Sequence, residues 1–141
     1  MKEVFSVIIL HYNQPDYLYT AIDSVLAQSY PAIQLIFSDD GSLDFSVENI
    51  ERYIHEKKQK NIIDFKVIRH QKNVGTVKNL NEAYSQCIGK YVLQFAADDA
   101  LYDSEVLAKF SRALNNVSKE TIGVFARSLD CDENLVWTGK E

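Results

Sequence analysis

Short apolar runs rich in β-branched residues alternate with segments of helical spacing along most of this 141-residue chain. The runs predict five strands, at 4–10, 33–37, 62–69, 91–97 and 122–128. Between them, apolar stripes and capping residues predict helices near 17–26, 46–58, 76–89 and 104–117. Because strands that alternate with helices form βαβ units, we expect one α/β domain with a mostly parallel sheet.

The fourth predicted strand ends abruptly in two adjacent carboxylates, Asp98 and Asp99. A run as apolar as 91–97, with so little alternation, is typical of a strand that is buried on both faces of a parallel sheet. Two ionised carboxylates 4 Å apart repel each other by roughly 4 kcal/mol at an effective dielectric constant of 20. A divalent cation with oxygen ligands removes that cost, whereas a solvated turn or helix N-terminus is the alternative explanation for these two residues alone.

Polar clusters also follow the other predicted strands. Residues 11–13 follow the first strand, Asp39 and Asp40 follow the second, and residues 73–79 lead from the third strand into a helix. The carboxyl ends of parallel strands share one edge, where open α/β folds bind ligands, and the N–H groups at a helix start would face the same crevice. Four clusters at one edge therefore predict a ligand site rather than four independent solvated turns.

The residue types at this edge suit a nucleotide that carries phosphates. One carboxylate pair can accept hydrogen bonds from a base or ribose, the other can hold a metal on a pyrophosphate, and Lys78 adds positive potential. The chain has no GxxxxGK[ST], no GxGxxG after the first strand and no GxSxG. Without a displayed nucleophile, group transfer by direct displacement is the reaction that we expect.

Composition narrows the class of protein further. The formal net charge of -5 argues against a general nucleic-acid binder. Cys87 and Cys131 lie in no CxxC or Cys/His cluster, so neither a zinc site nor a disulfide framework is expected. No apolar run is long enough to span a bilayer, and the N-terminus lacks a signal-peptide pattern. We therefore expect a cytoplasmic protein, with peripheral association at the inner face of a membrane left open.

Several segments between residues 3 and 117 resemble, in order and spacing, the motifs of family 2 glycosyltransferases. They are SVIILHYN at 6–13, AIDSVLAQSY at 21–30, DDGS at 39–42, NVG and KN at 73–75 and 78–79, and DD at 98–99. The resemblance implies a GT-A fold, with three α/β/α layers, a nucleoside-diphosphate sugar as donor (a UDP-sugar above all) and Mg²⁺ or Mn²⁺. It also implies transfer with inversion to a saccharide or lipid-linked acceptor hydroxyl, in polysaccharide or glycoconjugate biosynthesis.

By matched position, the resemblance also implies roles for individual residues. Asp99, with Asp98, would bind the metal, and Asp98 would face either the ribose or the metal. The residues implied in nucleotide binding are Leu10, Tyr12, Asn13, Asp39, Asp40, Lys78, Asn79 and Asp98. In this set the backbone around Leu10 and Tyr12 would border the base, and Asp40, together with Asp39, would accept hydrogen bonds from it.

The chain departs from the family motifs at three places. Leu10-His11 replaces the usual Pro-Thr, Lys78 replaces an Arg and loses its bidentate fork, and Ala96 replaces the first acid of D-x-D-D. We expect residues 1–141 to form one domain that ends before the acceptor-binding half, with the catalytic general base beyond Glu141. A non-catalytic nucleotide-binding or partner-binding module of the same fold is the alternative. A receiver domain and a sugar nucleotidyltransferase fit less well, because their characteristic residues after the first strand are missing.

Overall fold

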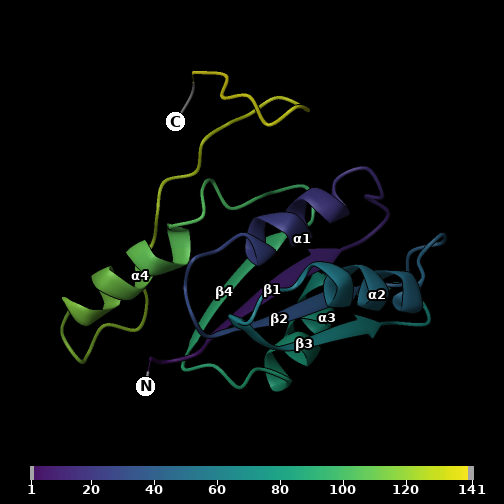
Figure 1. The fold of residues 1–141 in the computed structure, drawn as a ribbon. Helices are drawn as coiled ribbons and strands as arrows, with labels where there is room; N and C mark the ends of the chain where they lie inside the picture. The colour runs from purple at the N-terminus through teal and green to yellow at the C-terminus, as the bar shows by residue number, and fades with distance from the viewer. Residues whose placement is uncertain (1, 140–141) are drawn as a thin grey trace. The chain divides into compact units, whose positions relative to one another are not determined.

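The computed structural model describes residues 2–139, which contain four strands and four helices (Figure 1). In chain order these are β1 (Phe5–His11), α1 (Leu18–Leu26), β2 (Ile33–Asp39), α2 (Val47–Lys57), β3 (Ile62–Arg69), α3 (Thr76–Ser85), β4 (Tyr91–Ala96) and α4 (Val106–Asn115). The chain divides into two compact units, Met1–Ala108 and Lys109–Glu141. Among the described residues, none of the helices has the length and apolar character needed to cross a bilayer.

All four strands form one parallel sheet in the order β3-β2-β1-β4. Figure 1 shows α1 and α2 over one face of this sheet and α3 over the other. The predicted α/β class, parallel sheet and three layers are thus confirmed. The element order explains the arrangement, because each crossover helix returns the chain to the start of a new parallel strand.

The two central strands, β1 and β2, carry the core. All seven residues of β2 are buried, and so are all but one of the residues of β1. Ile8 and Ile36 pack against Ala83 of α3, while their neighbours along each strand face α1 and α2. Because helices cover both faces, these strands need no polar alternation, which is why they read as continuous apolar runs.

β4 differs from the central strands, although its sequence looks equally apolar. Its residues alternate between partly buried and exposed, with Val92 40% exposed and Gln94 also exposed. In the described sheet β4 pairs with β1 alone, and the side chain of Tyr84 in α3 donates a 2.6 Å hydrogen bond to Gln94 Oε1. The prediction that this strand is buried on both faces was therefore wrong, because β4 is the edge strand of the described sheet.

The predicted fifth strand at 122–128 is not formed, and this prediction was also wrong. Ile122 and Phe125 are 106% and 99% exposed, and the segment has no ladder partner in the described chain. β-propensity stabilises a strand only when neighbouring backbone pairs with it. The second unit instead contains an isolated antiparallel bridge between Cys131 and Trp137, around a turn in which Asp132 accepts hydrogen bonds from main-chain N–H groups.

Candidate functional site

Backbone hydrogen bonds join the carboxyl ends of the strands into one continuous edge. The N–H of Asp40 donates to His11 O at 2.9 Å, the N–H of Ala97 donates to Leu10 O at 2.8 Å, and the N–H of His70 donates to Asp39 O at 3.0 Å. Since β1 lies between β2 and β4, the ends of these two strands are about 10 Å apart, or two strand spacings. The clusters that follow β1, β2, β3 and β4 therefore lie along the same edge.

The carboxylate of Asp39 is fully buried in a hydrogen-bond network of its own. Its Oδ1 accepts from His11 Nδ1 at 2.8 Å and from Ser42 Oγ at 2.5 Å, and its Oδ2 accepts from the N–H groups of Gly41 and Ser42. The N–H of Gln14 donates to His11 Nε2, so these partners select the tautomer with the hydrogen on Nδ1. The network explains the close association of β1 with the turn after β2.

Burial alone would raise the pKa of Asp39, but hydrogen bonds from His11 and Ser42 outweigh it and hold the pKa below its ordinary value. Asp39 is thus ionised and enclosed, and its carboxylate stabilises the fold. The carboxylate is fully buried in this structure, and the predicted contact between Asp39 and a nucleotide base stays a prediction. The sequence signal for this network was His11 itself, which departs from the family pattern directly opposite the DDGS turn.

Asp40 fixes a second loop of the site. Its carboxylate is 4% exposed and accepts from the N–H groups of Val74 at 2.7 Å and Gly75 at 3.0 Å. Gly41 permits this approach, since a Cβ at that position would lie 2.5 Å from the carbonyl carbon of Lys72 and its φ is +78°. Two of the N–H groups predicted to face the crevice are therefore used by Asp40. The predicted role of Asp40 toward a base stays a prediction.

The loop after β1 is hydrogen-bonded to the turn after β2, and it leaves the ring of Tyr12 exposed. Asn13 has a positive φ of 52°, and its N–H donates to Ser42 Oγ at 2.8 Å. Its Oδ1 accepts from the N–H of Leu43 at 3.2 Å, so Asn13 joins the two loops. Tyr12, just before it, is 45% exposed, and Leu10 at the end of β1 is partly buried. Of these predicted residues, Tyr12 is the one whose ring is available to a ligand.

Two residues predicted to bind a nucleotide, Lys78 and Asn79, lie in the first turn of α3, and their side chains have different environments. Asn79 is 2% exposed, and its Oδ1 accepts from Ser38 Oγ at 2.6 Å while its Nδ2 donates to Ser38 O at 3.3 Å. Asn79 therefore attaches α3 to β2, and its predicted contact with a nucleotide stays a prediction. Lys78, one residue earlier, is exposed, so its positive charge is accessible at the start of the helix.

Asp98 and Asp99 form a tight turn directly after β4, in which the N–H of Asp99 donates to Ala96 O at 2.9 Å. Both residues are exposed. Burial of part of the carboxyl group, and then the charge of Asp98, raise the pKa of Asp99 above its ordinary value. This turn, which we call the acidic turn, therefore holds two accessible carboxylates whose mutual repulsion a cation would relieve.

The chemistry of the acidic turn fits Mg²⁺ or Mn²⁺. Among the described residues, no group of three or more His, Cys, Asp or Glu side chains could enclose a metal ion. Mg²⁺ in phosphate-transfer sites is held by one or two carboxylates, and substrate phosphates and water complete its coordination. Asp98 and Asp99 meet that requirement, with a diphosphate as the natural source of the other ligands.

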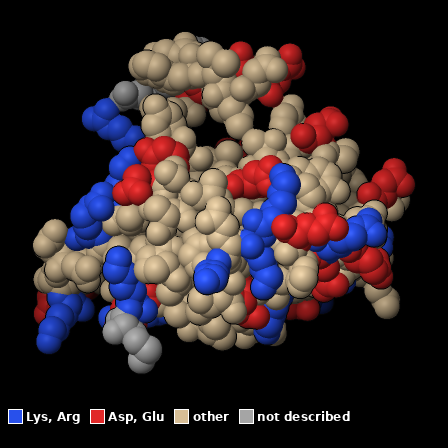
Figure 2. Space-filling model, viewed as in Figure 1, with Lys and Arg blue, Asp and Glu red and all other residues tan. Residues whose placement is uncertain are grey.

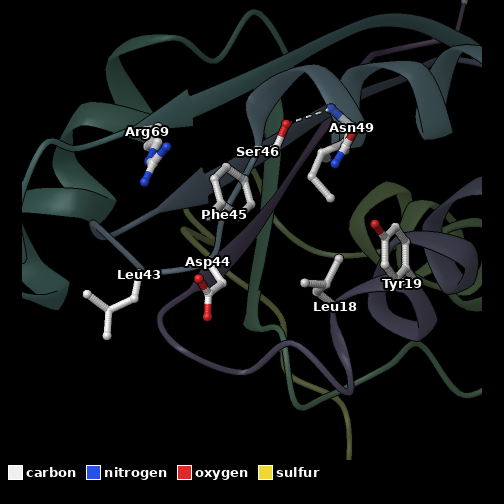
Figure 3. Close-up of a pocket in the computed structure, with 9 residues that line it drawn as sticks. Leu18, Tyr19, Leu43, Asp44, Phe45, Ser46, Asn49 and Arg69 are labelled. Carbon is white, nitrogen blue, oxygen red and sulfur yellow. Dashed lines mark hydrogen bonds between the residues drawn. The ribbon is translucent and has the colours of Figure 1, made fainter.

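A separate cavity of about 290 Å³ lies between the start of α1 and the segment that leads into α2. Figure 3 shows Leu18, Phe45 and Arg69 around it, with Ser46 capping α2 through the N–H of Asn49 at 3.2 Å. Neither carboxylate of the acidic turn lines this cavity. The predicted ligand site is therefore an open edge, and the cavity is a different feature of the molecule.

Comparison with known families gives a consistent result. The model of the family described as "Glycosyl transferase family 2" matches residues 6–137. Glycosyltransferase GlyG of Streptococcus pneumoniae is 25% identical over 100% of this chain and 46% of its own length. The cholesterol galactosyltransferase of Borreliella burgdorferi is 31% identical over 79% of this chain and 30% of its own length. The chain thus spans less than half the length of these curated relatives.

Solved structures show the same fold. TarS of S. aureus superposes with a TM-score of 0.67 and 27% identity over 79% of this chain and 32% of its own, and one of its structures contains UDP. Another holds UDP-GlcNAc and matches this chain equally well, with a TM-score of 0.67. The mannosyltransferase PcManGT of Pyrobaculum calidifontis, in complex with GDP-Man and Mn²⁺, has a TM-score of 0.72 at 19% identity, over 82% of this chain and 33% of its own. These neighbours have the parallel α/β architecture of the first unit.

Proposed function

Because this chain belongs to glycosyl transferase family 2, an enzyme family, we propose that its sheet edge binds the nucleoside-diphosphate part of a sugar donor. The observation that carries this proposal is the acidic turn, where Asp98 and Asp99 stay exposed at the same edge as Tyr12 and Lys78. The complex of TarS with UDP-GlcNAc supports a UDP-sugar as the donor.

Each exposed group has a distinct task in this proposal. The ring of Tyr12 stacks on the base, and the ammonium group of Lys78 attracts the phosphates. Asp98 and Asp99 supply oxygen ligands for a divalent metal on the diphosphate. A bound Mg²⁺ or Mn²⁺ would neutralise the charge on the departing nucleoside diphosphate. Asp39, Asp40 and Asn79 also hold the loops that present these groups.

The proposed reaction is transfer of the sugar with inversion. An acceptor hydroxyl of a saccharide or lipid-linked substrate attacks the anomeric carbon, the bond from that carbon to the diphosphate oxygen breaks, and the hydroxyl proton passes to a general base. Within the described residues, Oδ1 of the tail carboxylate Asp132 accepts hydrogen bonds from the N–H groups of Asn134 and Val136 in its own turn. We place the general base in an acceptor-binding half of a longer enzyme. Action in the cytoplasm, in polysaccharide or glycoconjugate biosynthesis, rests on the family alone.

A non-catalytic nucleotide-binding module is the second candidate, favoured by the engagement of Asp132 within its own turn. Both candidates share the donor site, so transfer of sugar from a UDP-sugar by a longer parent protein separates them. An enzyme would release UDP in step with acceptor modification, whereas a binding module would retain the intact donor.

Calorimetric titration of the chain with UDP, GDP and ADP, each with Mn²⁺ and with EDTA, tests the donor site. We expect UDP to bind best, and Mn²⁺ to tighten its binding at least tenfold, because the metal links the diphosphate to two carboxylates. Uridine, which lacks phosphates, should bind weakly and without metal dependence. Equal affinity for UDP in Mn²⁺ and in EDTA would contradict the proposal.

A further inference from the structure

The segment between the acidic turn and α4 contains no helix or strand, yet it is tied to the end of α1. The N–H of Leu101 donates to Ser24 Oγ at 3.1 Å, and Gln28 Nε2 donates to Asp103 O at 2.6 Å. The N–H of Ser29 then donates to Ser104 O at 2.8 Å. We call Ser24, Gln28 and Ser29 the α1 clamp.

Gln28 is the centre of this clamp. Its side chain is 3% exposed, and its Nε2 also donates to Ser24 O at 3.0 Å. Its Oε1 accepts from the N–H of Leu107 at 3.1 Å, in the first turn of α4, where helix N–H groups lack partners of their own. Both polar atoms of this buried amide have hydrogen-bond partners, so the amide fixes the geometry of the segment and of the start of α4.

The main chain of the α1 clamp is also hydrogen-bonded to Asn61, just before β3. Asn61 Nδ2 donates to Gln28 O at 2.6 Å and to Tyr30 O at 3.1 Å. Ile33 at the start of β2 in turn donates its N–H to Asn61 O at 2.8 Å. The end of α1 is therefore attached to the amino end of β2, a buried central strand, so the segment after the acidic turn is held by a well-packed part of the molecule.

The acidic turn needs such support because of its position. β4 is the edge strand of the described sheet, and the turn is joined to its single neighbour through the N–H of Ala97 and Leu10 O. Its two exposed carboxylates repel each other, so in the ligand-free protein they favour spreading of the turn. A metal site requires its ligands within a few tenths of an ångström of the right geometry.

We propose that Gln28, assisted by Ser24, is a positioning residue for the metal-diphosphate site, and that it acts through the segment that follows the acidic turn. This inference rests on the proposed function of the acidic turn. Gln28 touches neither metal nor nucleotide; it holds residues 101–107 so that Asp98 and Asp99 keep the spacing that a shared cation needs. Loss of an outer-shell partner of this kind typically costs 10-fold to 100-fold in metal affinity.

The test compares Gln28→Met with Gln34→Met. Gln34 is also a fully buried amide with all partners satisfied, but it bonds to Ser6, Asp64 and the segment after α3, and not to the segment that follows the acidic turn. We expect Gln28→Met to weaken Mn²⁺-dependent UDP binding at least tenfold, and Gln34→Met to change it less than threefold despite a similar loss of thermal stability. Wild-type affinity in Gln28→Met, or an equal loss in Gln34→Met, would overturn the inference.

Amide hydrogen exchange in the ligand-free protein provides a second readout that needs neither metal nor UDP. Gln28→Met should speed exchange of the Leu107 N–H at least tenfold relative to the core strands. The smaller change Ser24→Ala should do the same for Leu101 and weaken UDP–Mn²⁺ binding by less than Gln28→Met does. Unchanged exchange at both amides would refute the clamp. If wild-type protein binds no UDP while these amides respond as expected, the donor site fails and the clamp stands.

Discussion

The two pairs of adjacent aspartates, Asp39–Asp40 and Asp98–Asp99, look alike in the sequence and behave in opposite ways in the structure. Asp39 and Asp40 are 0% and 4% exposed, and all four of their carboxylate oxygens accept hydrogen bonds from the protein. Asp98 and Asp99 are exposed. Hydrogen bonds lower the pKa of Asp39 despite its burial, whereas burial and a neighbouring charge raise that of Asp99.

The difference follows from the strand that each pair terminates. β2 lies between β1 and β3, so loops from two neighbouring strands surround its end and supply donors. β4 has β1 as its single partner in the described sheet, so its end stays open on one side. A carboxylate pair at an interior strand thus organises the edge, while a pair at an outer strand remains available to a ligand.

The largest loss of stability should come from Gly41→Ala, which disrupts the turn that follows the buried carboxylates of Asp39 and Asp40. The new Cβ would lie 2.5 Å from the backbone of Lys72, at a φ of +78°. We expect the free energy of unfolding to fall by about 3 kcal/mol or more, from the left-handed backbone penalty and the clash together. Urea denaturation followed by circular dichroism measures this change.

Gly75→Ala is the matched control for that substitution. Gly75 also has a positive φ, +89°, but a Cβ there meets no atom within 4 Å, so the loss should come from backbone strain alone, about 1–3 kcal/mol, without the added clash. Equal losses in the two variants would show that the turn after β2 is not closely packed, and would weaken the contrast between the two aspartate pairs.

Asp39→Asn should have the next largest effect, because the amide cannot accept from all four donors that surround the carboxylate. We expect a loss of about 2–4 kcal/mol at pH 7. Because the folded pKa of Asp39 lies below its unfolded value of about 3.9, its stabilisation is complete above that value and disappears as the pH falls through the folded pKa. The difference between wild type and variant should therefore shrink below pH 4.

Denaturation curves at pH 7 and pH 3 measure this dependence. Asp16→Asn serves as the control, since Asp16 is exposed and its substitution should change stability by less than about 0.5 kcal/mol. A difference between Asp39→Asn and wild type that is as large at pH 3 as at pH 7 would rule out the ionised carboxylate as its source.

Asp99→Asn should have the smallest effect on stability, and it should stabilise the protein, whereas the preceding substitutions destabilise it. The raised pKa of Asp99 means that its ionised form costs stability at neutral pH in the absence of a cation. Removing the charge should raise Tm by about 1 °C in EDTA, as expected for relief of an exposed repulsion. A decrease of more than about 2 °C in a thermal melt would mean that Asp99, like Asp39, supports the fold.

The sequence predicted the parallel sheet, its helices and the shared edge because these depend on local patterns. Apolar runs, capping residues and strand–helix alternation are visible without any knowledge of contacts. The segment at 122–128 shows the limit of such patterns. Its run of apolar residues is typical of a strand, but a strand also needs backbone partners, and no local pattern specifies them.

Burial at the site could not be predicted for a similar reason. Asp39, Asp40 and Asn79 were grouped with Tyr12 and Lys78 because they share one edge, but which of them face inward depends on hydrogen bonds between distant segments. His11 and Ser42 are 31 residues apart and both contact Asp39. Gln28 reaches a carbonyl group 75 residues away. Such pairings become apparent only in the folded chain.

Titration of Asp99→Asn with UDP in the presence of Mn²⁺, beside Asp39→Asn at a temperature where both are folded, tests the central claim most directly. If the acidic turn holds the metal and diphosphate, Asp99→Asn loses the Mn²⁺-dependent gain in UDP affinity while remaining at least as stable as wild type. Asp39→Asn then keeps that gain despite its lower stability. Retention of the gain by Asp99→Asn, together with its loss in Asp39→Asn, would contradict the account.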